Sequence, residues 1–159
     1  MAEQRITPFL WFDHQAEEAA NFYVSVFPNS RISRIVRYGP AGPGPAGSVM
    51  NVEFELDGQT FTALNGGPLF KFSEAISFVV HCQTQAEIDA YWDKLSAGGE
   101  EQCGGWLKDR FGLSWQIVPV ELLQWLSSSD AEKSQRVMKA IMGMKKLDIG
   151  LMRRAYEKG

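Results

Sequence analysis

Few side chains in this sequence combine a reactive type with a spacing that would let them act together. The cysteines, Cys82 and Cys103, form no CxxC pair and are too few for a disulfide framework, which fits a reducing compartment. Free thiols are usually buried, so we expect both in the interior. We expect His14 to lie on the surface or to cap a helix. His81 ends an apolar run, where it is either a partly buried strand residue or a proton carrier that lines a pocket.

A second candidate for chemistry is the glycine- and proline-rich stretch from Gly39 to Gly47. A phosphate-binding loop would need a GK[ST] ending followed by a helix, and this stretch has neither. It also contains no side chain that could anchor it in a core. We therefore expect a mobile surface loop.

Composition limits the class of protein. The chain has 159 residues, of which 45% are hydrophobic and 22% charged, which is typical of one folded domain spanning residues 1–159. The net charge of −3 argues against a nucleic-acid partner. No apolar run approaches the ~20 residues that cross a bilayer. The first residues lack a signal-peptide layout, so we expect a cytoplasmic protein with no membrane partner.

The charges are distributed unevenly along the chain. Residues 131–159 contain eight Lys or Arg against three Asp or Glu, a balance of +5 that leaves −8 for residues 1–130. A basic tail and an acidic body could attract each other within one chain or across a dimer. Alternatively, the basic side chains form a solvated helix face.

Hydrophobic periodicity predicts a strand, a helix and three more strands over residues 5–66. Residues 6–12 form an apolar run that ends at Asp13, a residue suited to capping a helix. Strands are expected at 31–38, 50–57 and 59–64, with Asp57-Gly58 as a hairpin turn. The buried stripe of the helix consists of Ala16, Ala19, Ala20, Tyr23, Val26 and Phe27.

The same pattern returns over residues 74–119. A strand at 76–82 precedes the capping box Thr84–Glu87, and Gly98-Gly99 ends the helix that follows. Three further strands are expected, near residues 101–103, 106–109 and 114–118.

The two units align residue by residue. Gln15–Glu17 returns as Gln85–Glu87 at an offset of 70, whereas Gly58 and Gly112 align at 54, because the first unit has the longer connection. We therefore predict an α+β fold of two tandem β-α-β-β-β repeats. Residues 120–159 regain helical periodicity and form a helical tail, with a capping box at Ser129–Glu132 and a cap at Asp148.

Several stretches, spread over nearly the whole chain, resemble the PhnB-like branch of the vicinal-oxygen-chelate superfamily, which has the glyoxalase/bleomycin-resistance fold. They are Thr7–Phe12, Glu18–Tyr23, Val26-Phe27, Ile76–His81, Gly105–Gly112, Ser114–Pro119, Ala131–Met138 and Met144–Ile149. The resemblance implies two sheets curving around a small-molecule cavity, often in a homodimer, with or without a metal. Sequences of this branch often carry the name of a demethylubiquinone methyltransferase. A methyltransferase of the usual kind needs a doubly wound sheet with a Gly-rich turn, and no strand here leads into one.

The resemblance also implies where a metal would bind, in the first and last strands of each unit. Counting from the helix aromatic pair and the turn glycine places these positions near Pro8, Thr62, Phe78 and Gln116. Only Gln116 could be a ligand, and a shift of one residue offers only Phe9, Ala63 or Ser77. We therefore predict no metal and no cofactor.

The remaining candidates suit a flat or apolar ligand. Trp11, Trp106 and Trp115 could line the cavity or belong to the core. Asn65 and Gln116 could hold a ligand through amide hydrogen bonds. We expect the charged residues Lys108, Asp109 and Arg110 to face solvent.

Three functions follow from these residues. The first is a protein that binds a small, apolar or aromatic molecule in a metal-free cavity. The second is a glyoxalase-like lyase or isomerase that uses Gln116 with His81 or Cys103 on a carbonyl or vicinal-oxygen substrate. The third is a homodimeric assembly module whose cavity is filled and whose Met-rich tail mediates association.

Overall fold

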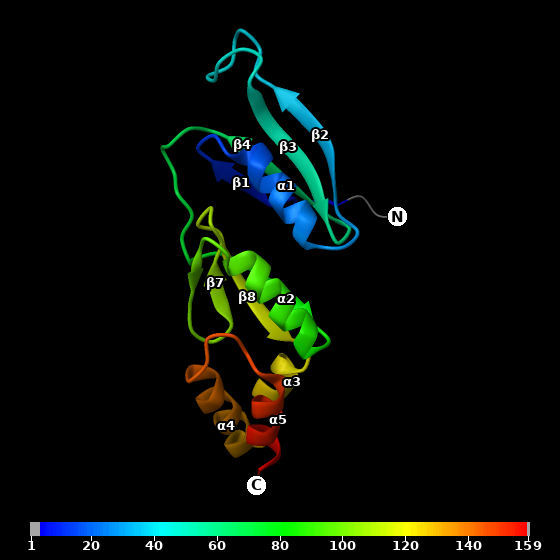
Figure 1. The fold of residues 1–159 in the computed structure, drawn as a ribbon, viewed down its shortest axis with the longest axis vertical. Helices are drawn as coiled ribbons and strands as arrows, with labels where there is room; N and C mark the ends of the chain where they lie inside the picture. Colours follow the sequence, from blue (N-terminus) through cyan, green and yellow to red (C-terminus); the bar gives the residue numbers. More distant parts are fainter. Residues whose placement is uncertain (1–3, 159) are drawn as a thin grey trace. The chain divides into compact units, whose positions relative to one another are not determined.

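The computed structural model describes residues 4–158, which fold as two compact units, one ending at Phe72 and one beginning at Ser73. Each unit contains one four-stranded mixed sheet and a helix that packs on it (Figure 1). The β-α-β-β-β pattern predicted from the sequence is therefore confirmed in both units.

The first unit consists of β1 (Phe9–Phe12), α1 (Ala16–Val26), β2 (Arg31–Arg37), β3 (Val49–Leu56) and β4 (Gln59–Asn65). The strand order is β1-β4-β3-β2, with β1 parallel to β4 and the other pairs antiparallel. The helix packs on the sheet through Tyr23, whose ring stacks on Phe54 at 6.2 Å between centroids. The predicted hairpin is confirmed, since Asp57 and Gly58 both have positive φ, 47° and 82°, as a type I′ turn requires.

One local expectation for this unit is wrong. Asp13 does not cap α1: the helix begins after Gln15, whose side chain makes no capping hydrogen bond.

The loop over residues 39–47 packs on the buried side chain of Tyr38, the residue just before it. A Cβ added at Gly44 would overlap the Tyr38 ring, so only glycine lets the loop lie this close.

The second unit consists of β5 (Ser77–Cys82), α2 (Gln85–Ser96), β6 (Glu100–Glu101), β7 (Trp106–Lys108) and β8 (Ser114–Pro119). Its strand order, β5-β8-β7-β6, repeats that of the first unit. The first and last strands of the unit, β5 and β8, are again parallel neighbours. The capping box is confirmed: the Thr84 hydroxyl accepts from Glu87 N at 3.1 Å, and the Glu87 carboxylate accepts from Gln83 N at 3.1 Å.

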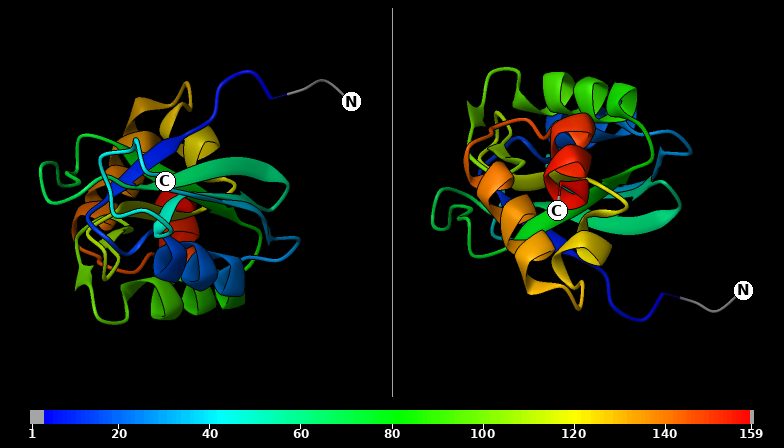
Figure 2. Two further views of the ribbon diagram at one scale, coloured as in Figure 1. Left: turned by 90° about the horizontal axis from the view of Figure 1, so that it is seen from above. Right: turned by 90° about the horizontal axis from the view of Figure 1, so that it is seen from below.

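Three helices follow the second sheet: α3 (Leu122–Leu126), α4 (Ala131–Met142) and α5 (Ile149–Glu157). Figure 2 shows α4 and α5 side by side. Asp148 caps α5 as predicted. The cap of α4 is Asp130, which accepts from Glu132 N and Lys133 N, so the box predicted to start at Ser129 is wrong.

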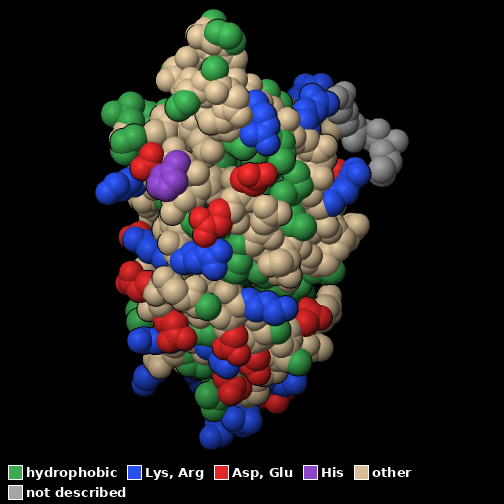
Figure 3. All heavy atoms as spheres, turned by 45° about the horizontal axis from the view of Figure 1, so that its top comes forward, with side chains coloured by type: hydrophobic (Ala, Val, Ile, Leu, Met, Phe, Trp, Pro, Cys, Tyr) green, Lys and Arg blue, Asp and Glu red, His purple; other side chains and the backbone are tan. Residues whose placement is uncertain are grey.

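The basic tail meets acidic groups within the same chain. Lys146 Nζ lies 3.0 Å from Asp89 Oδ1 on α2, which is the intrachain form of the attraction expected from the charge balance. On the face drawn in Figure 3, acidic and basic side chains are interspersed rather than separated into fields of one sign. No helix among residues 4–158 is long and apolar enough to span a membrane.

Candidate functional site

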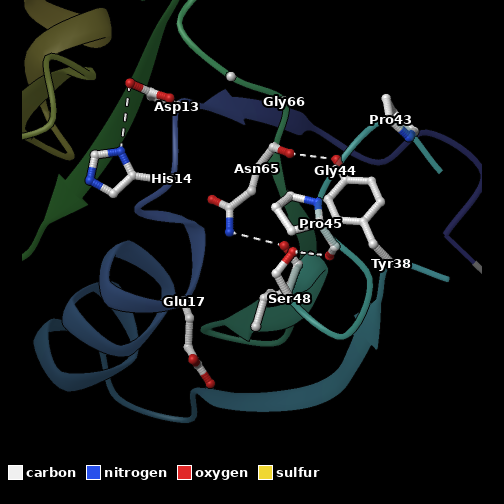
Figure 4. Close-up of a pocket in the computed structure, with 12 residues that line it drawn as sticks. Asp13, His14, Glu17, Tyr38, Pro43, Gly44, Pro45, Ser48, Asn65 and Gly66 are labelled. Atoms are coloured by element: carbon white, nitrogen blue, oxygen red, sulfur yellow. Dashed lines mark hydrogen bonds and ion pairs between the residues drawn. The ribbon is translucent and has the colours of Figure 1, made fainter. Parts of the chain in front are cut away.

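A pocket of about 540 Å³ lies in the first unit, where the start of α1, the end of β4 and the loop between β2 and β3 meet (Figure 4). Its volume is in the range of small-molecule sites in proteins. The residues that line it are Asp13, His14, Glu17, Tyr38, Pro43, Gly44, Pro45, Ser48, Val49, Asn65, Gly66 and Gly67.

Asn65 joins the walls of this pocket. Its Oδ1 accepts from Ala16 N at 2.8 Å and its Nδ2 donates to Val49 O at 3.1 Å. Its backbone carbonyl accepts from the Tyr38 hydroxyl at 2.6 Å. Asn65 was predicted to bind a ligand through its amide, and it does line the pocket. Both ends of the amide already bond to the protein, however, so its role there is to position α1, β3 and the loop.

Trp11 occupies the face of the first sheet that is turned away from α1, since its neighbours Leu10 and Phe12 are the buried residues of β1. Its indole N–H donates to Gly67 O at 2.9 Å, and Phe70 packs edge-on against its ring at 4.9 Å. A Cβ on Gly66 would lie 2.5 Å from ring atoms of Trp11. Trp11 therefore holds the segment after β4 in place and does not line this pocket.

The mouth of the pocket carries the ionisable groups of the site. His14 Nδ1 lies 3.6 Å from Asp13 Oδ2, and their side chains are 78% and 48% exposed. His14 is thus on the surface, one of the two positions expected for it. Within residues 4–158 the Glu17 carboxylate has no hydrogen-bond or ion-pair partner.

In the second unit, several predicted residues share the sheet face turned away from α2. Gln116 pairs with Val79 on one side and Trp106 on the other. Its Nε2 donates to the Ser77 hydroxyl at 2.9 Å. His81 lies two residues beyond Val79 on the same face and is exposed. These side chains form one row, which we call the Ser77–Gln116 row.

Trp115 and Asp109 are both buried in the second unit, which is one of the two positions expected for Trp115 but not the position expected for Asp109. Trp115 is 3% exposed, and its indole N–H donates to Asp109 Oδ2 at 2.9 Å, so it belongs to the core. Asp109 is only 2% exposed, and the expectation of a solvent-facing charge is wrong. Its Oδ1 accepts from Phe111 N and Leu113 N, because a buried carboxylate needs such donors.

Strand pairing shifts the expected metal positions by one residue. Thr62 pairs with Phe9 rather than Pro8, and Trp115 pairs with Phe78, which places Phe78 and Gln116 on opposite faces. The positions that share a face are therefore Phe9 with Thr62 and Val79 with Gln116. In the described part of the chain, no three His, Cys, Asp or Glu side chains gather in a group that could hold a metal ion.

The thiols differ in environment. Cys82 is buried, as expected, and burial together with the nearby Glu87 raises the pKa of its thiol to about 11. Cys82 therefore stays protonated at neutral pH and is a poor nucleophile. Cys103 is exposed, so the expectation of a second buried thiol is wrong.

Comparison with known proteins identifies the family. A family model described as 3-demethylubiquinone-9 3-methyltransferase matches residues 4–118. A Bacillus cereus PhnB protein described by the same methyltransferase name is 40% identical with a TM-score of 0.67, over 73% of this chain and 99% of its own. The match to the family model ends at residue 118, before α3. The helical tail over residues 120–159, whose sequence resembles the PhnB-like branch, therefore lies outside the match. A search of curated proteins finds no match.

More distant structures share the fold alone. A Pseudomonas aeruginosa protein is 20% identical with a TM-score of 0.61, over 74% of this chain and 98% of its own. The fosfomycin resistance protein FosX from Listeria monocytogenes, solved with Mn(II) and sulfate, is 14% identical with a TM-score of 0.50, over 74% and 90%. This chain therefore belongs to the 3-demethylubiquinone-9 3-methyltransferase family, the PhnB-like branch of the vicinal-oxygen-chelate superfamily.

Proposed function

We propose that this protein binds a small molecule with an apolar or aromatic body, and that the pocket of the first unit is the binding site. The observation that carries the proposal is the pocket itself, about 540 Å³ in volume and walled by groups that Asn65 ties together. Pro43, Pro45 and Val49 supply apolar contact surface. A preformed pocket of this kind binds without first ordering its walls, which favours affinity.

Binding without a metal is part of the proposal. FosX was solved with Mn(II). At the strand positions that the resemblance implies for a metal, this chain has Phe9 beside Thr62 and Val79 beside Gln116. Phenyl and isopropyl groups cannot coordinate an ion, and one amide with one hydroxyl does not make a site for a divalent cation. These four residues therefore do not fit a divalent metal ion.

We do not propose methyl transfer, although the family is named for it. The usual cofactor fold for that reaction is a doubly wound parallel sheet with a Gly-rich turn leading into a helix. Each sheet here has one parallel pair and two antiparallel pairs. The family name therefore describes kinship rather than chemistry.

The binding proposal is tested by filling the pocket. Ser48→Trp places an indole among the lining residues, whereas Ala46→Trp places one on the exposed loop nearby and serves as the matched control. A panel of one-ring aromatic compounds, including benzyl alcohol, should raise the melting temperature of the wild type and of Ala46→Trp but not of Ser48→Trp. Equal shifts in all three proteins would refute the pocket as the site.

A second candidate is lyase or isomerase chemistry at the Ser77–Gln116 row. The hydrogen bond between Gln116 and Ser77 favours it, because it fixes an amide beside His81 on one sheet face. The test is turnover of vicinal carbonyl compounds by the wild type and by His81→Ala and Gln116→Ala. Turnover that survives both substitutions in folded protein would remove this candidate.

Homodimerisation through the tail is a third proposal, alongside a cytoplasmic location. Met138 and Met142 share one stripe of α4 and are 39% and 71% exposed. Sedimentation of the full chain should give a dimer, and removal of residues 129–159 should give monomers. A dimer that persists without the tail would show that α4 is not the interface.

A further inference from the structure

We infer that the pocket of the first unit selects a positively charged ligand, such as an ammonium group carried on an aromatic or aliphatic body. The inference rests on the proposed function, because it assigns a chemical class to the ligand of the same pocket.

The hydrogen-bonding groups of the inner wall are committed to the fold. Asn65 uses its amide and its carbonyl, and Tyr38 uses its hydroxyl on Asn65 O. The Ser48 hydroxyl donates to Pro45 O at 2.6 Å. With their O–H groups engaged, Tyr38 and Ser48 can offer a ligand only acceptor lone pairs, beside the apolar surface of the wall.

The groups that remain at the mouth are acidic. Asp13 and Glu17 are the carboxylates that line the pocket, and the lining contains neither Lys nor Arg. Among the residues that line the pocket, His14 is the one basic side chain, and it is a cation only in its protonated form. With neutral His14, the lining carries a formal charge of −2, which attracts a cation and repels an anion.

The helix start does not reverse this preference. The N-terminus of α1 would favour an anion through its dipole. Its first turn already holds Glu17 and Glu18, however, and Asn65 Oδ1 accepts from Ala16 N. Asn65 Oδ1 therefore already takes one N–H of the helix start, and the carboxylates of the first turn repel a further anion.

Three probes with one ring and different charge test this inference: benzylammonium, benzyl alcohol and benzoate, titrated at pH 7 and low ionic strength. Benzylammonium should bind about fivefold more tightly than benzyl alcohol, the size expected for a partly exposed charge pair, and added salt should reduce the difference. Benzoate should bind most weakly. If benzyl alcohol or benzoate binds as well as benzylammonium, the charge preference is refuted while the proposed binding function stands. If none of the three binds, both are refuted.

Matched variants assign the preference to particular carboxylates. Glu17→Gln should remove the advantage of benzylammonium over benzyl alcohol, because it removes one of the two carboxylates of the lining. Glu18→Gln removes the same charge from the next position of α1, outside the pocket lining, and should keep most of the advantage. If the two variants lose equal amounts, the preference reflects net charge and the site assignment is wrong. A far-ultraviolet circular dichroism spectrum confirms that each variant is folded.

Discussion

The two β-α-β-β-β units carry the same three residues, Gln-Ala-Glu, where their helices start, yet α2 begins at Gln85 and α1 one position later, at Ala16. In the second unit Thr84 caps α2 locally. The equivalent position in the first unit, 70 residues earlier, is His14, which makes no cap, and Asn65 from β4 supplies the acceptor instead. In the second unit Pro119 lies at the strand position equivalent to Asn65, and a proline side chain cannot accept a hydrogen bond. A missing local signal is thus replaced by a contact across 49 residues, and that contact builds the pocket.

The connections between strands differ in the same sense. In the first unit, the long loop between β2 and β3 folds over Tyr38 and becomes a wall of the pocket. In the second unit, the shorter connection between β6 and β7 is held by the tail, since Gly104 N and Gly105 N donate to Met144 O and Lys145 O. The connection of the first unit therefore walls a pocket, whereas the connection of the second unit binds the segment between α4 and α5.

The largest loss of stability is expected from removing the buried carboxylate of Asp109 in the second unit. Asp109→Ala removes the acceptor for Phe111 N, Leu113 N and the Trp115 indole. The loss of these bonds should lower the free energy of unfolding by about 3 kcal/mol, because the donors remain buried. Urea denaturation measures it, with the exposed Asp93→Ala as control. A loss below that of the control would mean that Asp109 is not structural.

Asn65→Ala breaks the contact that distinguishes the first unit. It should lower the free energy of unfolding by about 2 kcal/mol, because both hydrogen bonds of the side-chain amide are lost and Ala16 N is left without its acceptor. Benzyl alcohol should also cease to raise the melting temperature. If the melting-temperature shift is unchanged in this variant, Asn65 does not organise the pocket.

Thr84→Ala tests the local cap of the second unit. It should cost about 1 kcal/mol, as loss of an N-cap hydroxyl usually does, and should not alter ligand binding. His14→Ala, at the equivalent position, should cost less than Thr84→Ala in the same denaturation experiment. Equal costs would contradict the difference between the two helix starts.

The smallest effect on stability at neutral pH is expected from Cys82, which occupies the position in the second unit that Phe12 occupies in the first. Burial raises the pKa of its thiol from 9.0 to about 11, so the folded protein holds this proton more tightly than the unfolded chain. Its contribution to stability is complete below pH 9 and is lost as pH rises toward 11. Iodoacetamide at neutral pH should therefore modify Cys103 at least about tenfold faster than Cys82. Comparable rates would contradict the burial of Cys82.

Local signals in the sequence predicted much of the fold. The Asp57-Gly58 turn, the Thr84 cap and the offset of 70 each depend on neighbouring residues or on a simple repeat, and all three are confirmed. The burial of Asp109 was missed because it follows from donors that only the folded turn brings together.

The pocket could not be predicted in the same way. The sequence shows Asn65 as an amide at the end of a strand, but its hydrogen bond to Ala16 N depends on the pairing of β1 with β4. The sequence predicts Tyr38 as the end of a strand, whereas its place under the loop depends on the glycines that let the loop cover its ring. The metal positions were displaced by one residue, because counting along the sequence does not fix which residues pair across a parallel ladder.

Amide chemical shifts measured during a benzylammonium titration show which unit holds the ligand site. The shifts should concentrate at residues 13–17, 48–49 and 65–67 of the first unit, with small changes along β5 and β8. Shifts centred on Ser77 and Gln116, with none around Asn65, would place the ligand on the second unit and refute the proposed site.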